Sequence, residues 1–234
     1  MAAAASAALV GGTIYWQARL GGERPGLDSP AVWDAPSALA AISAGNVRFV
    51  TSSRTLSIDT AHDSELRRQT AKEQHQFAII LCCSDSRVIP EFIFDQRAGS
   101  IFEIRNAGNV VDEDVLASFE YAVEHLHVPL LFVMGHKGCG AVHAVCEAGE
   151  KPLHDHLREL QKHMSGIHQD IIKFHKHHDP HVLVELSKKN ARQQALALLR
   201  DSRFLKTAVD KDEVRLMYGI YDMDTGSVEF FDLQ

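Results

Sequence analysis

The sequence lacks an excess of positive charge. It contains 24 Lys and Arg against 31 Asp and Glu, which gives a net charge of −7 over 234 residues. Nucleic-acid-binding domains gather basic residues on one face, and no such basic patch is present, so we expect no nucleic acid as a partner. Hydrophobic residues make up 45% and charged residues 24% of the chain, which is typical of a soluble globular protein and excludes a disordered one.

Cysteine is also scarce. Four cysteines in a chain of this length do not form the dense disulfide framework of a small secreted domain. Cys82 and Cys83 are adjacent and cannot bridge one another without strain. Isolated cysteines usually behave as small buried hydrophobes. The question is therefore which of these thiols are metal ligands and which only pack in the core.

Long apolar runs are missing as well. The first residues, MAAAASAALVGGTIYW, are apolar but too short and too interrupted by glycine for a membrane helix. They also lack the basic start and the clear cleavage site of a secretory signal. We expect a cytoplasmic protein without stable membrane insertion. The alternative is an exported form in which residues 1–20 are the remnant of a signal.

The remaining pattern predicts one α/β domain with a central, mostly parallel β-sheet flanked by helices. Residues 1–36 are an apolar segment followed by a linker or arm rich in Gly and Pro, and residues 37–234 are the domain. Short unbroken apolar runs predict buried strands, and helices between them predict right-handed βαβ units. The predicted helices are 37–50, 61–74, 112–126 and 138–147, the predicted strands are 77–81, 101–104 and 129–134, and a mostly helical region (150–208) precedes a hairpin or returning strand (213–232).

Two polar segments follow predicted strands of this sheet. Cys83-Ser84-Asp85-Ser86-Arg87 follows the first strand, and His136-Lys137-Gly138-Cys139 follows the third. Ligands bind outside the carboxyl ends of strands in open parallel sheets, so we expect the two segments to converge. Two thiolates and an imidazole are typical zinc ligands, with a fourth position for water or a carboxylate. The alternative is a core cysteine beside a surface histidine.

These two segments, together with Arg105-Asn106-Ala107-Gly108-Asn109, resemble the β-class carbonic anhydrases. The resemblance is carried by three motifs in order and spacing, and it runs from about Ala38 to Cys146 and more loosely to the C-terminal strand. It implies Zn²⁺ on three ligands and reversible hydration of carbon dioxide to bicarbonate and a proton by zinc-bound hydroxide. It also implies a dimer or higher even oligomer, with N-terminal helices extending across the dimer. The motifs are Cys83 to Arg87, Arg105-Asn106-Ala107-Gly108-Asn109 and Gly135-His136-x-x-Cys139-Gly140, and the implied ligands are Cys83, His136 and Cys139.

The resemblance makes Asp85 and Arg87 a catalytic pair next to the metal. Asp85 can accept the hydrogen bond of zinc-bound hydroxide, and the planar fork of Arg87 can hold Asp85 ionised and away from the metal. If the pair breaks, Asp85 is the fourth metal ligand of a closed form. A purely structural ion pair is the alternative. The implied substrate pocket consists of Gln74, Phe102, Ala107, Tyr121 and Gly140, some of which would serve the zinc of a neighbouring subunit.

Several residues have simpler interpretations. Family members with a regulatory bicarbonate site carry Trp and Gly where this chain has Ile80 and Cys82, so we expect no second anion site. Cys82 points opposite to Cys83 along a strand, and we interpret Cys82 and Cys146 as core residues. We interpret the segment 105–109 as a turn after a strand rather than a catalytic segment. Without the resemblance, Tyr121 is a core aromatic.

The sequence leaves open the role of a histidine-rich region and two rival functions. Eight of the 14 histidines lie in residues 150–208. We interpret HKHH at 175–178 as a solvated helix end, and whether the region 154–181 relays protons stays open. A carbon disulfide or carbonyl sulfide hydrolase on the same scaffold, and a catalytically silent zinc scaffold or sensor, are the rival functions. A dinucleotide-binding enzyme is disfavoured, because no G-x-G-x-x-G follows a predicted strand.

Overall fold

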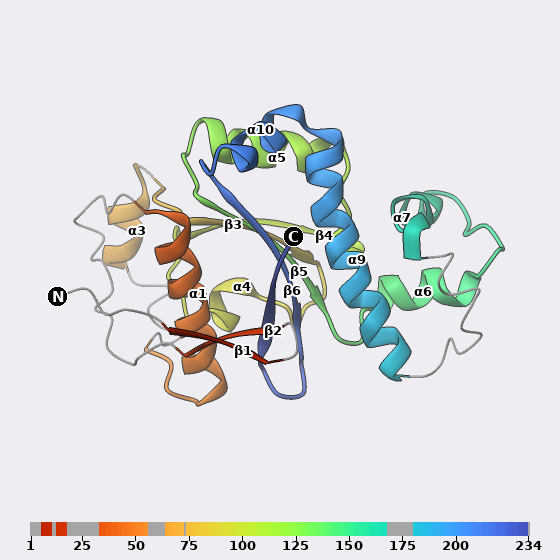
Figure 1. The fold of residues 1–234 in the computed structure, drawn as a ribbon, viewed down its shortest axis with the longest axis horizontal. Helices are drawn as coiled ribbons and strands as arrows, with labels where there is room; N and C mark the ends of the chain where they lie inside the picture. The colour runs from red at the N-terminus through yellow and green to blue at the C-terminus, as the bar shows by residue number, and fades with distance from the viewer. Residues whose placement is uncertain are drawn as a thin grey trace.

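A central β-sheet organises the molecule (Figure 1). The computed structural model describes residues 6–10, 13–17, 33–55, 64–72, 74–167 and 180–233. The sheet has five strands in the order β4-β3-β5-β6-β7, of which the first four are parallel and β7 is antiparallel to β6. The prediction of a mostly parallel sheet is confirmed. The strands are β3 (Ala78–Cys83), β4 (Ile101–Asn106), β5 (Leu130–His136), β6 (Arg215–Tyr221) and β7 (Val228–Asp232).

Helices cover both faces of this sheet, which explains why β3 and β5 are unbroken apolar runs. One face packs against α1 (Ala35–Val50) and the short α4 (Pro90–Ile93). The other packs against α5 (Glu113–Glu124), α9 (Pro180–Asp201) and α10 (Arg203–Asp210). Successive side chains of β3 alternate between the two clusters, as the period of a strand requires.

A third group of helices lies beyond the carboxyl ends of the strands. α6 (Gly140–Ala148) follows β5, and α7 (Leu157–His163) lies next to α6 (Figure 1). The first half of α9 also packs beside α6. Apolar residues of these helices form a separate buried cluster that includes Cys83 and Cys139. The candidate ligands are therefore enclosed by elements outside the two main layers.

The observed ends of two helices differ from the predicted ones. α1 begins at Ala35 instead of residue 37, because the Asp34 carboxylate accepts a hydrogen bond from the Ser37 N–H at 2.8 Å and caps the helix. The predicted helix 61–74 is shorter: α3 spans Ser64–Thr70, and residue 74 lies in a non-helical connection. Residues 61–63 and 73 lie outside the described residues.

The C-terminal region is a hairpin, one of the two forms that the sequence predicted. β6 and β7 pair antiparallel from Met217 with Asp232 to Tyr221 with Val228. The connecting turn places Gly226 at φ 77°, and the Asp222 carboxylate accepts a hydrogen bond from the Asp224 N–H at 2.8 Å. This hairpin brings Asp222 and Asp224 close to the end of β5, where Lys137 pairs with both.

Some residues of the predicted N-terminal segment and of the histidine-rich region lie outside the described residues. Ser6–Val10 (β1) and Thr13–Gln17 (β2) form a two-stranded antiparallel ladder. The predicted linker falls largely on residues 18–32, and the HKHH segment on 175–178, and both lie outside the described residues. The division at residue 36 stays a prediction.

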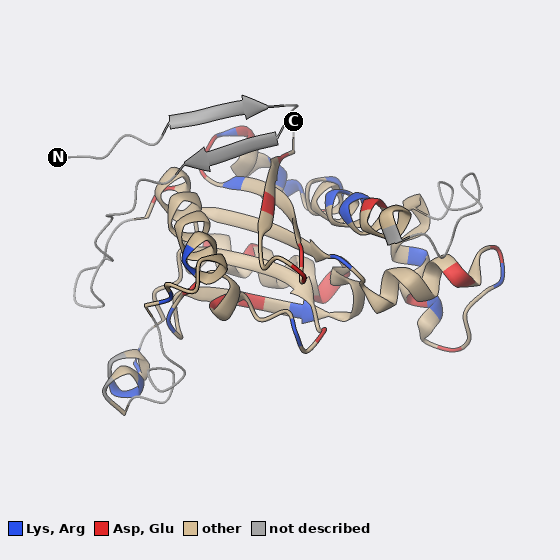
Figure 2. Cartoon of the chain, turned by 90° about the horizontal axis from the view of Figure 1, so that it is seen from below, with Lys and Arg blue, Asp and Glu red and all other residues tan. Residues whose placement is uncertain are grey.

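Of the helices that the structure describes, none is both long and apolar enough to cross a membrane. Both signs of charge occur along α9 (Figure 2).

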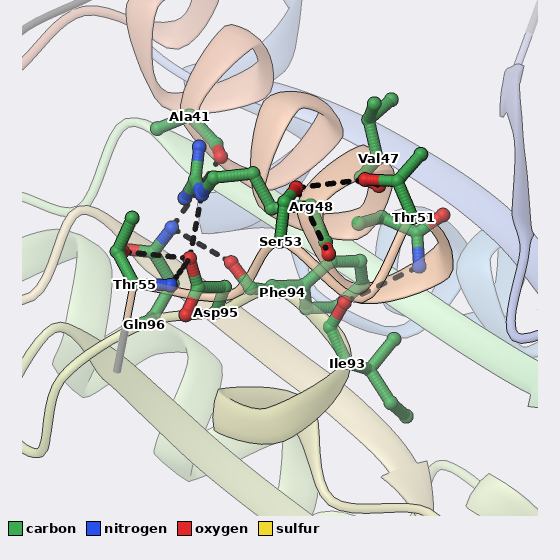
Figure 3. A network of polar contacts seen from close by, with 11 residues as sticks. Ala41, Val47, Arg48, Thr51, Ser53, Thr55, Ile93, Phe94, Asp95 and Gln96 are labelled. Carbon is green, nitrogen blue, oxygen red and sulfur yellow. Dashed lines mark hydrogen bonds and ion pairs between the residues drawn. The ribbon is translucent and has the colours of Figure 1, made fainter. Parts of the chain in front are cut away.

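A buried carboxylate ties α1 to the turn after α4 (Figure 3). Asp95 is 1% exposed and accepts hydrogen bonds from Arg48 Nε at 2.5 Å, from the Thr55 N–H at 3.2 Å and from Thr55 Oγ1 at 2.9 Å. An ionised carboxylate is costly to bury unless it is paired and hydrogen-bonded. These donors therefore hold together segments that are 40 and 47 residues apart in the chain.

We expect Arg48→Ala to lower the free energy of unfolding by about 3 kcal/mol, because it removes the guanidinium that pairs with the buried Asp95 carboxylate. Urea unfolding followed by circular dichroism measures the loss. Lys206→Ala is the matched control, since its exposed pair with Asp210 stabilises by no more than about 1 kcal/mol. Equal losses in the two variants would contradict the structural role of Arg48.

Candidate metal centre

The structure brings two thiols and an imidazole together at the carboxyl end of the sheet. Cys83 ends β3, His136 ends the neighbouring strand β5, and Cys139 is the N-cap of α6. Their ligand atoms all lie within 4.8 Å of one another, and the two sulfurs are 3.9 Å apart. All three side chains are buried. The two polar segments that the sequence placed after strands do converge.

The sheet topology explains this convergence. After β3 the chain moves to β4 on one side, whereas β5 lies on the other side of β3 and leads on to β6. The order of the strands therefore reverses between β3 and β5, and open α/β sheets leave a crevice at such a point. Gly138, at φ 68°, lets the chain turn between His136 and Cys139 so that both face the crevice.

His136 is oriented for coordination through one ring nitrogen. The residue is fully buried, and its Nδ1 lies 3.1 Å from the Lys137 carbonyl oxygen. A ring N–H that donates to a backbone carbonyl leaves the other nitrogen with a free lone pair. That nitrogen, Nε2, is buried and has no hydrogen-bond partner. Since buried polar atoms are normally satisfied, this orphaned nitrogen fits a metal ligand.

The two thiols lie within hydrogen-bonding distance, with 3.9 Å between their sulfurs. Cys139 donates a hydrogen bond to Cys83, which lowers the pKa of the Cys83 thiol to about 4 and raises the pKa of Cys139. The N–H of Gly108 also donates to Cys83 Sγ at 3.4 Å. Backbone N–H groups at the start of α6 act in the opposite direction and lower the pKa of Cys139. Cysteines bind a metal as thiolates, so a bound cation would release the protons that these thiols carry.

Asp85 and Arg87 form a bidentate pair at the mouth of the crevice. Arg87 donates to both carboxylate oxygens, at 2.9 Å from Nε and 2.7 Å from the terminal nitrogen, and its backbone N–H adds a bond of 3.0 Å. These hydrogen bonds hold the pKa of Asp85 well below its usual range. Arg105 fixes the same loop by donating to the Asp85 carbonyl oxygen at 2.9 Å. Asp85 is therefore an ionised acceptor held by Arg87.

A sequence model of the carbonic anhydrase family matches residues 78–228, which include every residue of this centre. A carbonic anhydrase of Pseudomonas aeruginosa is 32% identical over 181 residues, which is 72% of this chain and 79% of that protein.

The chain belongs to the β-carbonic anhydrase family.

The structural comparison specifies the class. The β-carbonic anhydrase CafA of Aspergillus fumigatus has a similar fold, with a TM-score of 0.65 and 26% identity over 73% of this chain and 82% of that one. Carbonic anhydrase 2 of Mycobacterium tuberculosis is 44% identical over 124 residues, which is 53% of this chain and 56% of that protein. The chain thus spans about half the length of this curated relative.

The residues that the β-carbonic anhydrase resemblance assigns to the pocket fall into two groups. Ala107 and Gly140 are exposed. Gly140 follows the candidate ligand Cys139, Ala107 precedes Gly108, whose N–H donates to Cys83 Sγ, and a Cβ on Gly140 would meet open space. Gln74, by contrast, precedes the amino end of β3, whereas Cys83 ends that strand about 17 Å further on. Gln74 is exposed and lies away from the metal centre of its own chain.

Two aromatic residues lie in the same half of the molecule as Gln74. Phe102 is near the amino end of β4, and its ring centroid is 6.3 Å from that of Tyr121 in the last turns of α5. Tyr121 is 46% exposed, so the interpretation as a core aromatic is wrong. His125 contacts Tyr121 at 5.2 Å between ring centroids, and sequence reasoning did not single out this contact.

The remaining cysteines pack in the core, as expected. Cys82 is fully buried in the cluster of α1 and α4, on the opposite face of β3 from Cys83, and burial raises its pKa above the usual value. Cys146, a residue of α6, is fully buried, and burial raises its pKa to about 11. Ile80 is also fully buried in the cluster with Cys82. The absence of a second anion site at these two positions stays a prediction.

The turn predicted at 105–109 is shorter, because Arg105 and Asn106 still belong to β4 and only Ala107–Asn109 form the turn, and it does more than reverse the chain. Gly108 has φ 74°, the conformation that favours glycine. Its N–H donates to Cys83, and Arg105 donates to backbone carbonyls of the segment 83–85. The sequence signalled the turn through its glycine. It carried no signal for which atoms the turn would face, because these contacts cross from β4 to β3.

Proposed function

We propose that this protein binds one Zn²⁺ per chain through Cys83, His136 and Cys139 and catalyses the reversible hydration of carbon dioxide to bicarbonate and a proton. The observation that carries the proposal is the convergence of two sulfurs and an orphaned imidazole nitrogen. Sulfur and nitrogen donors suit zinc, whereas magnesium and calcium prefer oxygen. When bound, Zn²⁺ lowers the pKa of a coordinated water from about 15.7 towards neutrality and so supplies the nucleophile.

The chain's own residues orient the reactants. The Asp85 carboxylate accepts a hydrogen bond from the nucleophile and directs its lone pair at the carbon atom of carbon dioxide. Arg87 keeps Asp85 ionised and, by occupying both carboxylate oxygens, holds it away from the metal. Gly140 begins α6, where helix N–H groups lack intrahelical acceptors, so its N–H is available to a substrate oxygen.

The second group of pocket residues supports a shared site. Gln74, Phe102 and Tyr121 gather near the amino ends of β3 and β4 and are exposed or half-buried. In the proposed dimer, or higher even oligomer, they complete the pocket of the neighbouring subunit's zinc. Light scattering on the purified chain tests this, and a monomer with full activity would refute it.

The decisive experiment is a carbon dioxide hydration assay on protein with measured metal content. Hydration that scales with zinc content supports the proposal. Full zinc content without hydration would favour a catalytically silent scaffold, against which the intact Asp85–Arg87 pair argues. Turnover of carbon disulfide or carbonyl sulfide, with none of carbon dioxide, would favour the hydrolase on the same scaffold.

We expect hydration to be fastest at alkaline pH and weak below neutrality. Two thiolate ligands place more negative charge next to the coordinated water than neutral imidazoles do, so this water loses its proton at higher pH. Falling pH also protonates the ligands and weakens metal binding. Stopped-flow rates from acid to alkaline pH, with zinc content checked at each pH, test this expectation. A flat profile would contradict it.

A further inference from the structure

Two buried amide side chains of α9 reach the metal centre from outside the family motifs. Asn190 is fully buried, and its Nδ2 donates to the Gly108 carbonyl oxygen at 2.8 Å. Gln194, one helical turn later and 1% exposed, donates from Nε2 to Asn190 Oδ1 at 3.1 Å. Because Oδ1 accepts from Gln194, the NH₂ group of Asn190 must face Gly108.

Gln194 is itself held at both ends. Its Oε1 accepts a hydrogen bond from the Val111 N–H at 2.8 Å, and its Nε2 also donates to the His163 carbonyl oxygen at 3.0 Å. The two amides thus connect α9 with the end of α7, with Gly108 in the turn at 107–109 and with Val111 after this turn. Buried amides are costly unless they are hydrogen-bonded, and here the partners fix the orientation of both groups.

Gly108 connects these amides with the Cys83 sulfur. Its carbonyl oxygen accepts from Asn190, while its N–H donates to Cys83 Sγ. The residue has φ 74°, and a Cβ there would lie 2.1 Å from Met164 Cε, so the turn is closely packed. A shift of the Gly108 carbonyl would therefore reorient the N–H that faces the sulfur.

We propose that Asn190 is a positioning residue of the metal centre: through Gly108 it holds the N–H that donates to Cys83, and Gln194 holds Asn190. This inference rests on the proposed function, because it concerns the same metal-binding group. Hydrogen bonds to a thiolate ligand moderate the charge that it donates to the metal. Loss of such outer partners typically costs about 10- to 100-fold in metal affinity or activity.

The test uses zinc-loaded Asn190→Asp, in which a carboxylate oxygen replaces the donor and repels the Gly108 carbonyl. We expect zinc transfer to a chromogenic chelator to become about 10- to 100-fold faster at a temperature far below unfolding. In the cobalt-substituted protein, the thiolate-to-metal charge-transfer band should shift. Ser187→Ala is the control on the same helix, since it removes a buried hydroxyl without a hydrogen-bond partner, and it should match the wild type.

A lowered unfolding midpoint with wild-type zinc release and an unchanged cobalt band would show that Asn190 is only structural. If Asn190→Asp does not fold, Asn190→Ala, which removes the donor without adding charge, is measured in the same way. Neither readout needs turnover, so the two proposals fail separately. A wild-type protein that holds zinc but does not hydrate carbon dioxide refutes the proposed activity alone.

Discussion

Cys139→Ala is expected to lose most of its zinc and nearly all carbon dioxide hydration. The variant removes one of three ligands from a group whose atoms lie within 4.8 Å of one another. The remaining thiol and imidazole cannot satisfy the preference of zinc for four ligands. Activity should fall by more than about 100-fold, since even outer partners of a metal account for changes of that order. Metal analysis of the purified variant and stopped-flow hydration measure the two losses.

Cys82→Ala is the matched control for this variant. Cys82 is adjacent to Cys83 and equally a free thiol, but it packs on the opposite face of β3. We expect it to keep about one zinc per chain and wild-type hydration. Full zinc occupancy with wild-type activity in Cys139→Ala would overturn the assignment of the ligands. Zinc loss in both variants would point to a general disturbance of the sheet.

Asp85→Asn should lower the turnover number by about 100-fold or more while zinc content stays at the wild-type level, since positioned acid–base groups contribute about 10²- to 10⁴-fold. An amide cannot stay anionic next to Arg87, and its NH₂ group cannot accept the hydrogen bond of the nucleophile.

Arg87→Ala should also lower the turnover number, for a different reason. Without the guanidinium, the pKa of Asp85 rises towards its ordinary value and the freed carboxylate can reach the metal.

Asp224→Asn provides the comparison for the Asp85 variants. Asp224 pairs with Lys137, which follows the proposed ligand His136, but the Asp224 side chain is exposed. Its loss should change hydration less than about fivefold, since exposed pairs contribute no more than about 1 kcal/mol. Steady-state kinetics at constant zinc content compare the variants. A wild-type turnover number in Asp85→Asn would leave the pair with a purely structural role.

The strands of the sheet were predictable because strands that are buried on both faces appear in the sequence as short unbroken apolar runs. The run 77–81 predicted β3, yet the strand continues through Cys82 and Cys83. Hydrophobicity does not show where such a strand ends, because pairing with β4 and β5 determines its last residue. The period of two, by contrast, correctly predicted that Cys82 and Cys83 face opposite sides of the sheet.

Residue types and local spacing indicated the donor set and the glycine turn at 108, and the resemblance implied the pairing of Asp85 with Arg87. These features depend on neighbours a few residues apart, and side-chain chemistry is readable at that range. The link from Asn190 to Gly108 was not readable, because the two residues are 82 positions apart and meet only when α9 packs across the sheet. The strand directions likewise decided that Gln74 lies away from its own metal centre. Packing between distant segments brings such groups together, and no local pattern in the chain encodes it.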